Sequence, residues 1–161
     1  METSTDPICC PKFDPIPWDN VNFEWNDKLF VKSSVCTFFY MPLNFGSVMK
    51  RLNKTISAAG ADWSQGLCLS DITSKWNMDL YINVDKPVPA LESKIFTGKF
   101  YSKVYEGPFK DTGKWCNDFD RVLVEKGYHK QKVYHWYTTC PKCAKKYGKN
   151  YVVMIAQIGL T

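Results

Sequence analysis

Two segments of the chain carry the same helix pattern, and this repetition is the feature that most restricts the possible folds. In each segment apolar residues lie four, eight and twelve positions before a glycine: Ile56, Leu52 and Val48 before Gly60, and Leu123, Phe119 and Trp115 before Gly127. Residues at this spacing share one face of a helix, and glycine is a common residue just after a helix end. The sequence therefore predicts two similar amphipathic helices, over residues 45–59 and 112–126.

Segments with strand patterns flank both helices in the same order. In the segment 75–84 apolar residues alternate with polar ones, so one face should pack on a helix while Asp79 and Tyr81 lie together on the other. The chain ends in two strands joined by a long basic connection, which is typical of a hairpin. The predicted strands are 29–41, 67–72, 75–84, 93–105, 133–139 and 151–158.

These elements form two strand–helix–strand–strand units, about 29–86 and 93–161, separated by a proline-containing linker. We therefore predict an α+β fold in which the duplicated units build one antiparallel sheet, with two helices on one face and a concave cleft on the other. Residues 29–161 would be a single domain. Residues 1–28 contain four prolines, which exclude a helix or a long central strand, and are expected to be an extended arm that packs on the domain.

The composition restricts the class of protein further. Aromatic residues make up 16% of the 161 residues, and a ligand pocket is one use for so much ring surface. No apolar run approaches the roughly 20 residues of a membrane span, and the N-terminus shows no secretory signal pattern, so we expect a cytoplasmic protein. The net charge of +5 lies in the C-terminal half. Because no nucleic-acid motif accompanies it, we expect a solvated surface rather than a nucleic-acid partner.

Seven cysteines, an odd number, favour reduced thiols or a metal site over a set of disulfides. Cys140 and Cys143 form a CxxC pair in the basic connection, and the adjacent Cys9 and Cys10 could supply the other two ligands of a zinc site. Redox chemistry at the CxxC and simple reduced thiols are the alternatives. The remaining three cysteines lie on apolar segments and are expected to be small core residues: Cys36, Cys68 and Cys116.

Carboxylates near aromatic residues are the candidates for binding or catalysis. Asp79, or Glu106 beside a Gly-Pro turn, could bind a cation or act as a general base if it faces the cleft. The simpler alternative is an exposed residue on the wet side of the sheet or in a turn. His135 has no Ser or Cys partner by spacing, so a satisfied structural histidine is expected. The ring residues expected to line the cleft, or else to pack in the core, are Trp76, Tyr81, Tyr105, Trp136, Tyr137 and Tyr151.

The segment 104–109, reading VYEGPF and followed by a helix that ends at Gly127, resembles the GyrI-like small-molecule-binding domain. This is the effector-binding fold of multidrug-sensing regulators. The family pattern has His and Tyr where this chain has Tyr105 and Phe109. The whole chain, with its KWNMDLYI and YTTCPKCAKKYGKNYVV segments, looks like a stand-alone branch of the family that is often labelled hydrolase or uncharacterised. The multidrug-sensing members carry a buried Glu on the last strand, whereas this chain has only Gln157 there.

The resemblance implies a protein that holds a small hydrophobic or aromatic molecule in its central cleft. Some similar proteins hydrolyse strained electrophiles with a Tyr/Glu pair, so the alternative is a hydrolase that pairs Glu106 with Tyr105 or Asp79 with Tyr81. A third possibility is a structural or partner-binding protein. A carboxylate and a Tyr within hydrogen-bond reach would favour the hydrolase, whereas a cleft filled by its own aromatic residues would favour the structural role.

Overall fold

A computed structural model describes residues 13–39, 41–63, 67–138, 148 and 150–160. It contains the predicted strand–helix–strand–strand order twice, with only short additional elements. The first half comprises η1 (Ile16–Trp18), β1 (Val21–Phe38), β2 (Met41–Pro42), α1 (Phe45–Ala58), β3 (Cys68–Ser74) and β4 (Asn77–Asn83). The second half comprises β5 (Glu92–Glu106), η2 (Phe109–Asp111), α2 (Thr112–Glu125), β6 (Tyr128–Tyr137) and β7 (Tyr151–Leu160). The predicted α+β class and the duplication of the unit are therefore confirmed.

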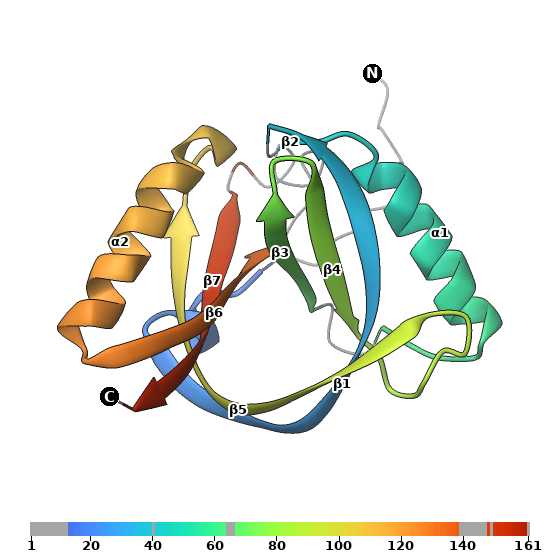
Figure 1. The fold of residues 1–161 in the computed structure, drawn as a ribbon, viewed down its shortest axis with the longest axis horizontal. Coiled ribbons are helices and arrows are strands. Elements are labelled where there is room, and N and C mark those ends of the chain that lie inside the picture. The colour runs from blue at the N-terminus through green and yellow to red at the C-terminus, as the bar shows by residue number, and fades with distance from the viewer. Residues whose placement is uncertain (1–12, 40, 64–66, 139–147, 149, 161) are drawn as a thin grey trace.

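All strand pairs in the sheet are antiparallel, and the sheet closes on itself. The strands follow the order β1–β4–β3–β6–β7–β5, and β5 pairs again with β1. The short β2 adds to the end of β1. Figure 1 shows α1 and α2 on the two outer sides of the strands, while β1 and β5 cross beneath the others.

Both helices cover the same face of the sheet, as the register of the strands shows. Leu80 lies opposite Ser70, Ser70 opposite His135, and His135 opposite Met154, so these four side chains share a face. Leu80 belongs to the core under α1, whereas Met154 belongs to the core under α2. The prediction of two helices on one face is therefore confirmed.

The concave face of the sheet carries a core that is mostly aromatic. Its members are packed ring against ring, with centroid separations such as 4.6 Å between Trp25 and Phe100 and 4.8 Å between Phe30 and Phe96. Rings from the N-terminal segment, Phe13 and Trp18, pack against the same core. Its buried residues are Trp25, Phe30, Leu67, Leu69, Tyr81, Phe96, Phe100, Tyr134, Trp136, Val153 and Ile155. Much of the predicted cleft is therefore filled by the side chains of the protein itself.

The strand boundaries differ most from the prediction in three places. The strand expected over 133–139 is β6, which begins at Tyr128 and ends at Tyr137. The first strand begins at Val21 rather than at residue 29, because the prolines end at Pro17 and the segment from Val21 to Trp25 pairs with β5. Trp76, which was expected on the helix-facing side of its strand, lies in the β3–β4 turn and is 54% exposed. The turn ends the alternation there, so Trp76 contacts Phe38 and Phe39 instead.

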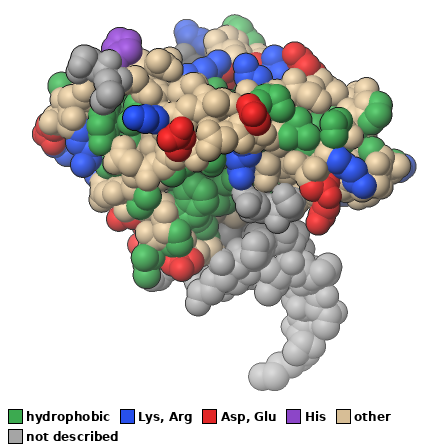
Figure 2. Space-filling view, turned by 90° about the horizontal axis from the view of Figure 1, so that it is seen from below, with side chains coloured by type: hydrophobic (Ala, Val, Ile, Leu, Met, Phe, Trp, Pro, Cys, Tyr) green, Lys and Arg blue, Asp and Glu red, His purple; other side chains and the backbone are tan. Residues whose placement is uncertain are grey.

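Within the described residues, neither helix is long and apolar enough to span a membrane. Figure 2 shows Lys and Arg side chains interspersed with Asp and Glu on the lower face, which is how a solvated surface is usually composed.

Candidate functional site at the seam between the two halves

The two halves meet where β3 and β6 pair, and this contact is short. Only two register positions join the strands, Leu69 with Trp136 and Ser70 with His135. Beyond Ser70, β3 continues toward Ser74, while β6 runs back toward Tyr128. We call this junction the seam. Because the ladder between the strands ends there, side chains rather than backbone hydrogen bonds fill the space between the halves.

Four charged side chains gather on the concave side of the seam. Asp71 and Asp79 lie directly opposite each other in the β3–β4 pair. The Asp71 carboxylate is 2.7 Å from the Lys132 ammonium, which reaches over from β6. Lys32 lies 3.8 Å from Asp79 and 3.9 Å from the exposed Glu92. Asp71 and Asp79 thus each have a partly exposed lysine beside them, and one of these lysines is shared with Glu92.

Asp79 is fixed by neutral donors as well. Its Oδ1 accepts hydrogen bonds from the Ser34 hydroxyl at 3.0 Å and from the Asn77 side-chain amide at 3.0 Å. Its side chain is 14% exposed, so the carboxylate is largely withdrawn from water. Buried carboxylates normally acquire such partners, because an uncompensated buried charge is costly. Two hydrogen-bond donors, with the Lys32 ammonium 3.8 Å away, therefore hold Asp79 in one orientation.

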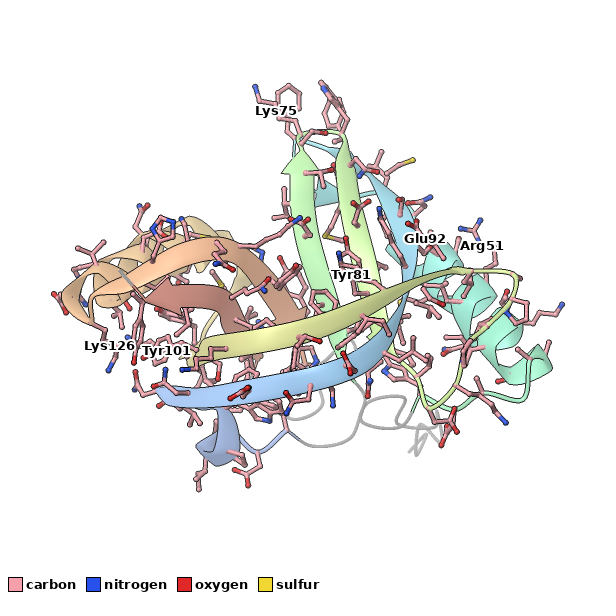
Figure 3. The ribbon with its side chains drawn as sticks, turned by 60° about the horizontal axis from the view of Figure 1, so that its bottom comes forward. Arg51, Lys75, Tyr81, Glu92, Tyr101 and Lys126 are labelled. Atoms are coloured by element: carbon pink, nitrogen blue, oxygen red, sulfur yellow. The ribbon has the colours of Figure 1, made fainter. Side chains whose placement is uncertain are left out.

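Three aromatic rings lie beneath these charges. Tyr81, Phe96 and Tyr134 contact one another edge to face, with centroid separations of 5.3–5.9 Å. Figure 3 shows Tyr81 between β4 and β5. Burial raises the pKa of Tyr81 and of Tyr134, so both hydroxyls remain protonated near neutral pH and can donate hydrogen bonds. We call Asp71, Asp79, Lys32, Lys132, Tyr81, Phe96 and Tyr134 the inner seam cluster.

The second predicted carboxylate–tyrosine pair does not form. Glu106 is exposed at the end of β5, and successive residues of a strand face opposite sides of the sheet. Tyr105 instead donates a 2.7 Å hydrogen bond to Asp118 of α2 and stacks on Trp115. Hydrogen bonds from Lys103, Arg121 and Tyr105 hold the pKa of Asp118 well below its usual range. A carboxylate bound in this way is a poor general base.

The other predicted ring residues are spread over separate parts of the molecule. Trp136 and Tyr151 pack with Phe13 of the N-terminal segment, while Tyr137 lies near His135 on the helix-covered side. Trp76 is at the exposed tip of the β3–β4 hairpin. Of the residues proposed from the sequence, only Asp79 and Tyr81 lie together in the inner seam cluster.

Asp71, Lys32, Lys132 and Tyr134 were not proposed from the sequence. Asp71 and Lys132 come from different halves, and no local pattern indicates which strand pairs with which. The alternation along each strand could have placed them on a face, but not beside each other. The cysteines of the predicted zinc site, Cys9, Cys10, Cys140 and Cys143, lie outside the described residues.

The fold is similar to that of a solved structure. The crystal structure of the EcmrR C-terminal domain matches with a TM-score of 0.69 at 8% identity, covering 89% of this chain and 99% of that domain. The protein therefore shares the fold of that domain, in agreement with the GyrI-like fold that the resemblance implied. A search among curated proteins gave no match. The family model described as Bacterial hydrolase matches residues 1–158, and the chain belongs to this family.

Proposed function

We propose that the protein binds a small, neutral molecule with an aromatic or hydrophobic body at the inner seam cluster. The observation that carries the proposal is the gathering of two carboxylates, two ammonium groups and two tyrosine hydroxyls beside a ring cluster, at the place where the two halves stop pairing. A mainly apolar site with a few converging polar groups is what small-molecule pockets usually offer.

The stability of the fold does not by itself explain the charged residues of this cluster, because apolar residues could stabilise it as well. A buried ion pair often contributes no more than well-packed apolar residues of similar volume, because both charges must leave water. Asp71 is nevertheless buried, and the Asp79 side chain opposite it is only 14% exposed. The rings that fill much of the cleft favour a structural role, whereas the charged groups gathered beside them favour binding.

The charges of the cluster indicate the ligand class. The carboxylates of Asp71 and Asp79 are offset by the ammonium groups of Lys32 and Lys132. A cationic ligand would have to displace a lysine, whereas a neutral group that both donates and accepts hydrogen bonds would meet partners of both kinds. The two lysine side chains are 32% and 46% exposed, so they can swing outward and admit a ligand to the rings beneath.

A second function, hydrolysis, is favoured by one geometric observation together with membership of the hydrolase family. Asp79 and Tyr81 share a face of β4, and Asp71 lies opposite Asp79. One carboxylate could then act as general base toward water while the Tyr81 hydroxyl donates to the leaving oxygen. The ring residues would hold the apolar part of the substrate.

Three probes of similar size test the binding proposal: benzamide, toluene and benzyltrimethylammonium. Titration followed by protein NMR should show benzamide binding most tightly, with shifts centred on Tyr81 and Tyr134. Asp71→Asn should weaken benzamide binding about tenfold or more, because a charge-assisted hydrogen bond is worth about 1.5–3 kcal/mol. Asp120→Asn, at an exposed ion pair with Lys130, is the matched control. Tighter binding of the cation, or equal effects of the two variants, would contradict the proposal.

Hydrolysis is tested separately with styrene oxide, a small aromatic epoxide, by measuring diol formation with mass spectrometry. Asp79→Asn should lower the rate by about 100-fold or more if Asp79 is the base. Binding of benzamide without diol formation would support the binding role alone.

A further inference from the structure

The helix-covered side of the seam holds a second group of reactive side chains, separate from the inner seam cluster. Ser70 and His135 occupy the last register pair between β3 and β6, and both face the helices. Cys116 lies in the second turn of α2, with its Sγ 3.5 Å from His135 Nε2. The thiol of α2 therefore contacts the imidazole of β6, and Ser70 of β3 lies opposite that histidine in the ladder.

Two polar atoms of this group are buried without a hydrogen-bond partner. They are the Ser70 hydroxyl oxygen and His135 Nδ1, in residues that are 1% and 8% exposed. Leaving a buried polar group unpaired costs about 1–3 kcal/mol, and such groups are uncommon unless they serve a function. Because the residues form a cross-strand pair, a small rotation of either side chain brings Nδ1 and the hydroxyl toward each other. His135 thus has Nε2 in contact with Cys116 Sγ, while Nδ1 has no partner among the described residues.

We propose that Cys116 and His135 form a nucleophile–base pair that reacts with small activated acyl compounds, and that Ser70 positions the imidazole. Cys116 Sγ lies 3.5 Å from Nε2, and after such a rotation Nδ1–H would donate to the Ser70 hydroxyl oxygen. A nucleophile, a base and a third group that orients the base are the parts that nucleophilic catalysis requires. Cys116 is half-buried, so a small electrophile can approach the sulfur.

Both members of the pair are neutral at rest. Burial lowers the pKa of His135 to about 4, so the imidazole is neutral at physiological pH. Burial, with a smaller contribution from Asp120, raises the pKa of Cys116, so its resting form is the thiol. A neutral thiol reacts only if a base removes its proton during the attack, and His135 Nε2 is the base in contact with it.

The reaction can be written with p-nitrophenyl acetate, a simple activated ester. Cys116 Sγ attacks the acetyl carbonyl carbon while its proton moves to His135 Nε2, and the C–O bond to p-nitrophenolate breaks. The products are an acetyl thioester on Cys116 and p-nitrophenol, which takes up the proton. Attack by water on the thioester, with His135 again as base, releases acetate and restores the thiol.

Peptide mapping by mass spectrometry tests the proposal, with Cys36 as an internal reference. Cys36 is an exposed free thiol on β1, outside this group. In the wild-type protein Cys116 should gain one acetyl group from p-nitrophenyl acetate. His135→Gln should slow acetylation of Cys116 by about 100-fold and leave the rate at Cys36 unchanged. Ser70→Ala should slow it less, by about three- to tenfold, because Ser70 only orients the base.

Equal acetylation of Cys116 in the wild type and in His135→Gln would overturn the assignment, as would labelling of Cys36 with none at Cys116. If His135→Gln does not fold, Ser70→Ala and Cys116→Ala decide the question. Ser70→Ala must slow acetylation at Cys116 and leave Cys36 unchanged. Cys116→Ala must abolish the rapid first release of p-nitrophenol that accompanies acetylation of Cys116. Neither result depends on ligand binding at the inner seam cluster, which the benzamide titration measures.

Discussion

The Lys132 ammonium lies 2.7 Å from the Asp71 carboxylate, and this ion pair joins the two halves of the protein at the seam. Asp71 belongs to β3 in the first half, while Lys132 belongs to β6 in the second. The pair occurs just beyond the last backbone register position between these strands. A side-chain ion pair therefore connects β3 and β6 where the backbone pairing of the antiparallel ladder ends.

Replacing Lys132 with Met should destabilise the protein, because the Asp71 side chain is only 10% exposed and would lose its cation. The lysine is itself 46% exposed, so we expect about 1–2 kcal/mol, between the values for exposed and buried pairs. Urea unfolding measures the change. Lys130→Met breaks a pair of similar length, 2.8 Å to Asp120, whose members are both about half exposed. Lys130→Met should lower the free energy of unfolding by less than about 1 kcal/mol. An equal loss in Lys132→Met and Lys130→Met would contradict the burial of the Asp71 carboxylate.

The stability of the fold should fall on mild acidification because of His135. Its pKa is about 4 in the folded protein, below the ordinary value of 6.5. Between these values the unfolded chain binds more protons than the folded one, so stability is lost as pH drops through this window. The free energy of unfolding at pH 7 and pH 5, measured with urea, should differ less in His135→Gln than in the wild type. The chain has only one other histidine, the exposed His129. His129→Gln should keep the wild-type slope, and a slope unchanged in both variants would contradict the prediction.

Tyr105→Phe should weaken the attachment of α2 to β5. The substitution removes a 2.7 Å hydrogen bond to Asp118, a carboxylate that keeps hydrogen bonds from Lys103 and Arg121. We expect a loss of about 1.5 kcal/mol, the low end for hydrogen bonds to charged groups. Tyr128→Phe removes a 3.1 Å hydrogen bond to the Asn22 side chain and should cost less than half as much. Thermal unfolding of the two variants side by side measures both losses. A larger loss in Tyr128→Phe than in Tyr105→Phe would contradict a strong Tyr105–Asp118 hydrogen bond.

Phe119→Ala should be among the most damaging substitutions on α2. Phe119 is fully buried and stacks on Tyr101 with a centroid separation of 5.9 Å. Removing a buried ring leaves a cavity and costs about 3–5 kcal/mol. Val124→Ala, on the same helix but 78% exposed, should change the free energy of unfolding by about 0.5 kcal/mol or less. Chemical denaturation provides both values, and a small effect of Phe119→Ala would mean that α2 is not docked as described.

The repeated helix pattern and the alternation of residues 75–84 were sufficient to predict the elements of the fold. Apolar periodicity is a local property, so it identified α1, α2 and most strands, and it placed Asp79 and Tyr81 on one face of β4. It did not detect that the first strand starts at Val21, because that segment is a strand mainly through its pairing with β5. Nor did it place Trp76 correctly, since the position of a turn depends on where β3 and β4 begin to pair.

The candidate sites depend on distant contacts, which periodicity does not encode. Asp71 and Lys132 are 61 positions apart in the chain, and Cys116 and His135 meet only because α2 packs on β6. The sequence by itself determined the secondary structure, the duplication and the faces that are apolar, because these follow from the order of side chains along one element. The tertiary structure decided which strands meet at the seam and which charges are buried there, because these depend on how two similar halves close into one sheet.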